Sequence, residues 1–153
     1  LNAVMEQRQT RSLTIPQTGE TIEPHPEFRV VATANPGYQG TYELNDAFED
    51  RFRHIKLTYL PAEVETDLIL DRTGLDDARR QEVEDLVALA GRLREAYVDG
   101  ELSTPVTTRE LVRIAQFIQD DFMDLKAAAK SELVARVSEY DETLVETYIA
   151  KRL

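Results

Sequence analysis

Hydrophobic positions follow two different spacings along this chain, and the change falls near Pro61. Before it, short apolar runs alternate with loops, a pattern typical of β-strands, and five of the six prolines lie at or before position 61. After it, apolar residues recur every three or four positions, which indicates amphipathic helices. We therefore expect an α/β segment in residues 1–60 and an all-α bundle in residues 61–153.

The first part contains short runs that predict strands: residues 12–15, 21–22, 28–33 and 53–57. The first two flank a turn containing Gly19 and predict a β-hairpin. The run at 28–33 is more continuously apolar, so we expect a strand buried within a sheet and ended by the Asn-Pro-Gly at 35–37. Residues 1–9 carry apolar side chains at helical spacing and predict the end of a helix.

The second part predicts a series of helices. Their apolar positions are Val64, Leu68 and Ile69; Val83, Leu86, Val87, Ala90, Leu93 and Tyr97; Leu111, Ile114, Ala115, Ile118 and Phe122; Leu133, Val134 and Val137; and Leu144, Val145, Tyr148 and Ile149. Gly74 should end the first helix, and Asp76 and Asp77 place negative charge near the start of the second. Asp141 is a candidate cap for the last helix.

Composition and charge narrow the classes of function. The chain has no cysteine, so it has no disulfide and no thiolate metal site, which favours a reducing, cytoplasmic setting. No apolar run reaches the roughly 18 residues of a membrane span. The formal net charge of −11 repels nucleic acid, and no basic cluster is larger than Arg79 and Arg80. We expect neither direct nucleic-acid binding nor a membrane span.

Few residues are candidates for chemistry. His25 and His54 lack metal-ligand spacing, and the chain has no Gly-rich phosphate loop and no Ser-His-Asp pattern. Asn35 would follow the carboxyl end of a strand, where ligands bind in open α/β sheets, but Asn-Pro is also a common start of a turn. Arg51 has the planar, permanently charged fork that suits a phosphoryl group, or it is a solvated arginine beside neighbouring acids.

Arg109 is a third candidate. Thr107 and Glu110 have the spacing of a capping box, and Val106 and Leu111 occupy the positions of a hydrophobic staple, so a helix should begin here. Arg109 then lies in the first turn, where the helix dipole disfavours a positive charge. An arginine at a helix N-terminus is suited to an anion, and the alternative is a solvated side chain.

The candidates belong to an ordered set of stretches, which includes VVATANP at 30–36, LNDAFEDRF at 44–52 and TTREL at 107–111. In this order they resemble the C-terminal half of an AAA+ ATPase core, most closely in the MoxR-like branch with its CbbQ/NorQ-type and gas-vesicle relatives. Residues 1–9 are similar to the helix after the Walker B strand, and residues 13–23 to the β-hairpin inserted before sensor 1.

The resemblance implies a role for each candidate. Asn35 would be sensor 1, and Arg51 would be the arginine finger, both catalytic. Arg109 would be sensor 2, contacting the nucleotide from a helical lid formed by residues 61–153. Arg53, two residues after Arg51, competes for the finger role. Residues 1–60 would be the C-terminal part of the α/β subdomain.

The resemblance also implies an activity and partners. The intact protein would hydrolyse ATP and use that energy to remodel or activate a client protein, including insertion of a metal or cofactor. It would form a homo-oligomer, expected to be a hexamer, and work with a von Willebrand factor A domain protein. The Walker A loop and Walker B acids of the family are absent, and the chain begins with Leu1, so we expect a piece of a longer protein. ATP and Mg²⁺ would be held mainly by the upstream half, and this segment alone would be inactive.

Two other interpretations stay open at this point. The chain could be an acidic interaction module that binds a basic partner, with the β segment structural. It could also belong to another AAA+ branch that carries the same hairpin, such as the McrB-like or dynein/midasin-like ATPases. The residues upstream of Leu1 would separate these interpretations, because an interaction module needs no phosphate-binding loop.

Overall fold

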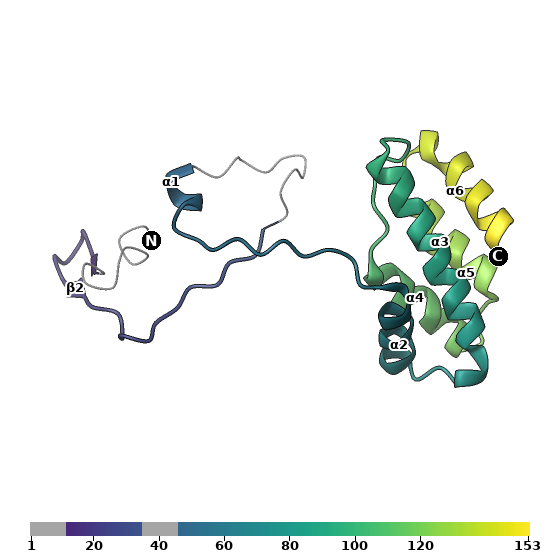
Figure 1. Ribbon diagram of the computed structural model, residues 1–153, viewed down its shortest axis with the longest axis horizontal. Coiled ribbons are helices and arrows are strands. Elements are labelled where there is room, and N and C mark those ends of the chain that lie inside the picture. The colour runs from purple at the N-terminus through teal and green to yellow at the C-terminus, as the bar shows by residue number, and fades with distance from the viewer. Residues whose placement is uncertain (1–11, 35–45) are drawn as a thin grey trace. The chain divides into compact units, whose positions relative to one another are not determined.

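The computed structural model describes residues 12–34 and 46–153 (Figure 1). The chain divides into two units, Leu1–Leu57 and Thr58–Leu153, and each is considered by itself. The helix predicted for residues 1–9 and the candidate Asn35 lie outside the described residues.

The first unit contains the predicted β-hairpin. Strands β1 (Leu13–Thr14) and β2 (Thr21–Ile22) pair in antiparallel fashion. The turn between them is closed by hydrogen bonds from the Ile15 N–H to the Glu20 carbonyl and from the Gly19 N–H to the Ile15 carbonyl, both 2.8 Å. Gly19 has a φ of +72°, a left-handed conformation that glycine adopts without steric cost, which explains why this turn needs a glycine.

Two predicted strands of this unit are wrong. Residues 28–33 and 53–57 are not in a strand, and Val31 is 90% exposed rather than buried. A strand needs a partner for its backbone groups, and in the described part of the chain β1 and β2 pair only with each other. Within the stretch 44–52, residues Asp46–Glu49 form the single helical turn α1.

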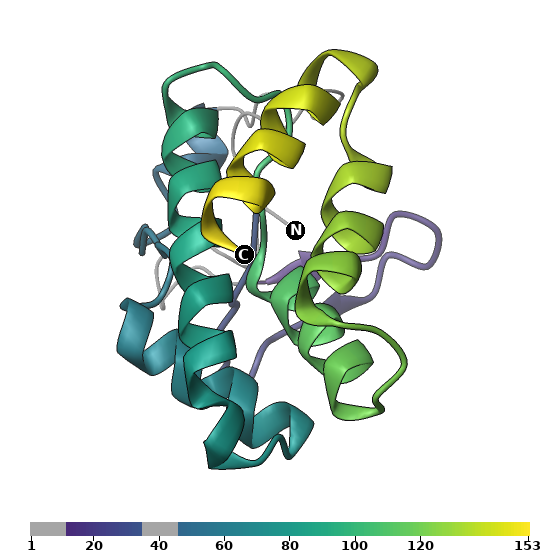
Figure 2. The same cartoon turned by 90° about the vertical axis from the view of Figure 1, so that its right-hand side faces the viewer.

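The second unit is helical, as its hydrophobic spacing predicts. Its elements are α2 (Ala62–Thr73), the 3₁₀ turn η2 (Asp77–Arg79), α3 (Arg80–Val98), α4 (Thr108–Gln119), α5 (Leu125–Leu133), the 3₁₀ turn η3 (Val134–Arg136) and α6 (Glu139–Arg152). The long helix α3 packs against α2, α4 and α6, and α4 packs against α5. Figure 2 shows α6, at the C-terminal end of the colour scale, beside α3.

Local signals set the first helix ends correctly. Gly74 ends α2 with a φ of +69°, and its N–H donates to the Leu70 carbonyl at 2.9 Å. Asp76 accepts a hydrogen bond of 2.8 Å from the Ala78 N–H, which starts the η2 turn that leads into α3. Both predictions are confirmed because each depends on residues within four positions of the helix end.

The last two helices differ from the prediction. Helix α5 begins earlier than the predicted apolar set, after Asp124, whose carboxylate accepts from the Ala127 N–H at 2.7 Å, and Val137 lies beyond the helical segment. The buried face of α5 includes Ala128 and Ala129, whose small side chains give a weak hydrophobic signal. Ser138 occupies the N-cap position of α6, so Asp141 lies inside the first turn of that helix and is not the cap.

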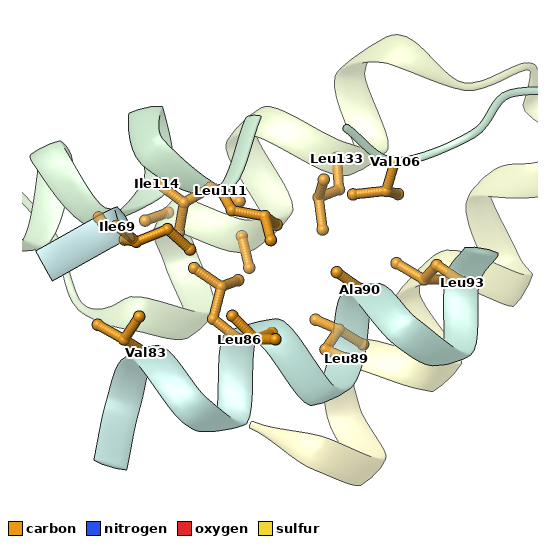
Figure 3. Close-up of a cluster of buried hydrophobic side chains, with 14 of the residues drawn as sticks. Ile69, Val83, Leu86, Leu89, Ala90, Leu93, Val106, Leu111, Ile114 and Leu133 are labelled. Carbon is orange, nitrogen blue, oxygen red and sulfur yellow. The ribbon is translucent and has the colours of Figure 1, made fainter. Parts of the chain in front are cut away.

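Aliphatic side chains from the helices form one core. Figure 3 shows Ile69 of α2, Leu86 of α3 and Leu111 and Ile114 of α4 directed toward one another, and all four are completely buried. Burying a side chain of this kind contributes about 1.5–3 kcal/mol. The core therefore holds α4 rigidly against α2 and α3, and this fixes where the first turn of α4 lies.

Candidate functional site at the start of helix α4

The start of α4 is closed by the predicted capping box. The Glu110 carboxylate accepts hydrogen bonds from the Thr107 N–H at 2.5 Å and from the Thr107 hydroxyl at 2.9 Å. Val106 and Leu111, on either side of the cap, are both buried in the core, as a hydrophobic staple requires. The helix therefore begins at one well-defined residue.

Arg109 lies in this first turn with its side chain exposed. It makes no hydrogen bond or ion pair with the described residues, whereas its neighbours Thr108 and Glu110 are both bonded. The first N–H groups of a helix also lack intrahelical acceptors. A permanent positive charge thus lies at the positive end of the helix dipole, on a fixed helix end, which is an arrangement suited to a phosphate oxygen.

A buried ion pair lies directly behind this helix end. Arg94 of α3 donates to both carboxylate oxygens of Glu65 of α2, at 2.7 and 2.8 Å. The Arg94 Nε–H donates to the Val106 carbonyl at 2.8 Å, and the Thr108 hydroxyl donates to Glu65 at 2.6 Å. The residues on both sides of the Thr107 cap are therefore bonded to one Glu65–Arg94 pair.

The charge state of Glu65 follows from these contacts. Burial by itself raises the pKa of the Glu65 carboxyl, but the hydrogen bonds from Arg94 and Thr108 and the charge of Arg94 together lower its pKa below the ordinary value. Glu65 is therefore ionised at neutral pH, and the buried charge of Arg94 is balanced. Such a pair fixes geometry more than it adds net stability.

Two further ion pairs connect α4 to the following helices. Glu110 pairs with Arg136 of η3 at 2.7 Å, and Arg113 pairs with Glu132 of α5 at 2.7 Å. Glu110 thus bonds both the cap of its own helix and a neighbouring element. These contacts leave Arg109 as the cation of the first turn that remains available for a ligand.

Comparison with known proteins assigns the chain to a family. The family described as CbbQ/NirQ/NorQ C-terminal matches residues 65–151, which is more than half of the chain. The chain belongs to this family. It is therefore a MoxR-like AAA+ protein, as the sequence resemblance predicts.

The curated relatives that match this chain are themselves uncharacterised proteins. A protein of Staphylococcus haemolyticus is 30% identical over 143 residues, which cover 93% of this chain and 52% of the relative. A protein of Staphylococcus aureus strain NCTC 8325 is 29% identical over the same length and coverage. The chain therefore spans about half the length of the curated relatives it matches.

Within this CbbQ/NirQ/NorQ-family chain, the predicted site residues belong to different units. Arg51 and Arg53 lie in the unit Leu1–Leu57, in the exposed segment that follows α1, and Arg109 lies in the unit Thr58–Leu153. The turn that contains Arg51 is closed by a hydrogen bond of 2.9 Å from the Phe52 N–H to the Glu49 carbonyl. Each arginine is therefore described only with its own surroundings.

Metal and membrane sites are also absent from residues 12–34 and 46–153. No group of three potential metal ligands occurs in these ranges. No helix there is long and apolar enough to cross a bilayer. The side chains around Arg109 suit the phosphates of a nucleotide rather than the Mg²⁺ that accompanies it, because the group presented there is a cation.

Sequence reasoning missed the Glu65–Arg94 pair. Arg94 lies four residues after Ala90 on the apolar face of α3, and Glu65 lies four residues before Ile69 on the buried face of α2. A charged residue at a core position is the available signal, because such residues are almost never buried unless they are paired. The sequence alone does not say which two charges form the pair.

Proposed function

We propose that the protein is part of a MoxR-like AAA+ ATPase that couples ATP hydrolysis to the remodelling or activation of a client protein. The observation that carries this proposal is Arg109, an exposed arginine without a partner among the described residues, on the rigidly held first turn of α4. In this role the unit Thr58–Leu153 is the lid, and Arg109 binds a phosphate of ATP as sensor 2.

The chemistry needs positioning and charge stabilisation rather than a covalent intermediate. Water attacks the γ-phosphate in line with the leaving group, and negative charge spreads over the phosphate oxygens. Asn35 orients that water, and Arg51 stabilises the developing charge on the nucleotide of a neighbouring subunit. Mg²⁺ neutralises phosphate charge when ATP is bound. The residues that hold ATP and Mg²⁺ most tightly belong to the Walker motifs of the family, outside this segment.

The proposal includes an assembly. A finger that acts on a neighbour requires at least two subunits, so the proposed intact protein is a homo-oligomer, and a hexamer is the expected form. Its client is a protein, with a von Willebrand factor A domain partner as the candidate, and its compartment is the cytoplasm. The acidic surface, with a formal net charge of −11, favours such protein partners over nucleic acid.

Arg51→Ala in the full-length protein tests the finger role. ATP turnover should be lost while ATP binding stays close to that of the parent, because the finger acts in the transition state. Arg53→Ala is the matched control, since it removes an exposed arginine two residues away. Loss of turnover in the Arg53 variant alone would transfer the role to Arg53, and loss of ATP binding in the Arg51 variant would contradict the assignment.

A mixing experiment tests whether the finger acts between subunits. Arg51→Ala subunits keep their Walker motifs, and subunits with a blocked Walker B acid keep their arginine. Mixed rings should recover part of the ATPase activity, because each variant supplies what its neighbour lacks. The absence of recovery in rings shown to contain both variants would place the finger within one subunit.

A further inference from the structure

We infer that Arg94 is a positioning residue that transmits the position of the lead-in segment, residues 58–61 before α2, to the start of α4. This inference rests on the proposed function, because it concerns the site that presents Arg109. It is carried by a chain of contacts that begins at Tyr59 and ends at Thr108, the residue next to Arg109.

The first contact is between Arg94 and Tyr59. The guanidinium carbon of Arg94 lies 3.8 Å from the centre of the Tyr59 ring, which is the geometry of a cation–π contact. Tyr59 is two residues before Pro61, whose carbonyl accepts from the Glu65 N–H at 2.9 Å in the first turn of α2. The lead-in segment is thus attached to the face of the same guanidinium whose edge is bonded to Glu65.

The second contact set leads from Arg94 to α4. The Arg94 guanidinium contacts both residues that flank Thr107. It bonds the Val106 carbonyl directly, and it bonds Glu65, which accepts from the Thr108 hydroxyl. Bidentate bonds fix the plane of a guanidinium as well as its position. A shift of the Arg94 plane therefore moves the Val106 carbonyl and, through Glu65, the Thr108 hydroxyl together.

The contacts between Arg94, Glu65 and the start of α4 are buried and therefore rigid. Arg94 is 10% exposed and Glu65 is 1% exposed as side chains, so water cannot easily replace a lost bond. Tyr59, in contrast, is 46% exposed and lies before the first residue of α2. The exposed end of the chain of contacts is therefore the lead-in segment, and the buried end is the ion pair beneath the first turn of α4. A displacement of the lead-in segment would therefore change the position of Arg109.

The test uses Tyr59 variants of the full-length protein. Tyr59→Leu keeps apolar bulk but removes the aromatic face, and Tyr59→Phe keeps the face. Tyr97→Leu is the matched control, because Tyr97 is 41% exposed in the same unit and makes no cation–π contact among the described residues. None of these residues is part of the core, so the variants should fold.

Hydrogen–deuterium exchange measures the structural half of the inference. Peptides that cover the first two turns of α4 should exchange about three- to tenfold faster in Tyr59→Leu, as expected from the loss of one cation–π contact. Tyr59→Phe and Tyr97→Leu should match the parent. Equal exchange in Tyr59→Leu and Tyr97→Leu would overturn the inference, whatever the protein does with ATP.

Kinetics measure the functional half. Tyr59→Leu should raise the KM for ATP about three- to tenfold with little change in kcat, and it should add nothing in an Arg109→Ala background, because both changes act through one side chain. If Arg109→Ala leaves the KM unchanged, the sensor role in the proposed function fails, while the exchange result stands by itself. If Arg109→Ala raises the KM but Tyr59→Leu does not, Arg94 is only structural and the inference is overturned.

Discussion

Arg94 and Glu65 are 29 residues apart in sequence, and they form a buried, two-bond ion pair at 2.7 and 2.8 Å. The pair joins α3 to α2 and, through Thr108, also holds the start of α4. Because the pair lies beneath the first turn that presents Arg109, the stability of the helical unit and the geometry of its candidate site depend on the same contacts.

Removing one member of this pair should be strongly destabilising. Glu65→Ala leaves the charge of Arg94 buried without a counter-charge, so the free energy of unfolding should fall by about 3–5 kcal/mol. Chemical denaturation of the helical unit, followed by circular dichroism, measures this change. Asp67→Ala on the same helix is the control, because the Asp67–Arg80 pair is exposed and screened by solvent. Equal decreases in the free energy of unfolding of the two variants would contradict the prediction that the buried pair matters more than the exposed one.

The stability of the helical unit should depend on pH through Glu65. Its pKa is lowered in the folded state from an ordinary value of 4.5, so its contribution is complete well above pH 4.5 and is lost as the pH falls through the folded value. Glu65→Gln should be less stable at pH 7 and should lose less stability between about pH 5 and 3. Denaturation curves across this range measure both effects.

A control for the pH experiment is Glu63→Gln, which removes one exposed carboxylate from the same helix without touching the buried pair. Some acid sensitivity should remain in Glu65→Gln, because the hydrogen bonds from the Ser103 hydroxyl and N–H also lower the pKa of Asp141. A parent-like pH dependence in Glu65→Gln would show that Glu65 does not carry the predicted linkage.

Arg109→Ala should weaken ATP binding by the full-length protein without destabilising it. A hydrogen bond to a charged group contributes about 1.5–3 kcal/mol, so the dissociation constant should rise roughly 10- to 100-fold. The free energy of unfolding should be unchanged or slightly higher, because a positive charge in a first helical turn is unfavourable. Calorimetric titration with ATP and thermal unfolding provide the two measurements.

Arg72→Ala is the matched control for Arg109. Arg72 is also an exposed arginine with no hydrogen bond or ion pair to described residues, but it lies in the last turn of α2, where the helix dipole favours a cation. Its removal should leave ATP affinity unchanged and should slightly lower stability. Equal effects of the two variants on ATP affinity would indicate a general effect of net charge rather than a site.

Asp141 should be important for the loop between α3 and α4. Its carboxylate accepts from the Ser103 hydroxyl at 2.5 Å and from the Ser103 N–H at 3.1 Å. Asp141→Ala should lower the free energy of unfolding by about 1–3 kcal/mol, because donors near the buried carboxylate lose their acceptor. Glu142→Ala, the next and exposed carboxylate of the same turn, is the control and should have a smaller effect. Urea denaturation compares the two variants.

Much of the helical unit could be predicted because its signals are local. The Gly74 helix end and the Thr107–Glu110 capping box each depend on residues within four positions of one another, and the structure confirms both. The hairpin around Gly19 is confirmed for the same reason. The start of α5 was predicted wrongly because its hydrophobic signal is weak. Its buried face includes Ala128 and Ala129, whose small side chains contribute little to a hydrophobic pattern.

The other failures concern partners that the pattern does not name. Residues 28–33 have the composition of a buried strand, but a strand exists only where another strand accepts its hydrogen bonds, and the described residues provide none. Aspartate is a residue type that often caps helices, yet Asp141 accepts a hydrogen bond from Ser103, 38 residues away. In both cases the residue types matched the predicted role, but the hydrogen-bond partner that the role requires was absent or was a different residue.

The sequence by itself determined the helical periodicity of the second unit, the position where α4 begins and the presence of Arg109 in its first turn, because these properties follow from neighbouring residues along one chain segment. The tertiary structure decided that Glu65 and Arg94 are buried together and that Thr108 and Tyr59 contact them. That decision required the packing of α2, α3 and α4, since only packing removes water from a charge and makes its pairing obligatory.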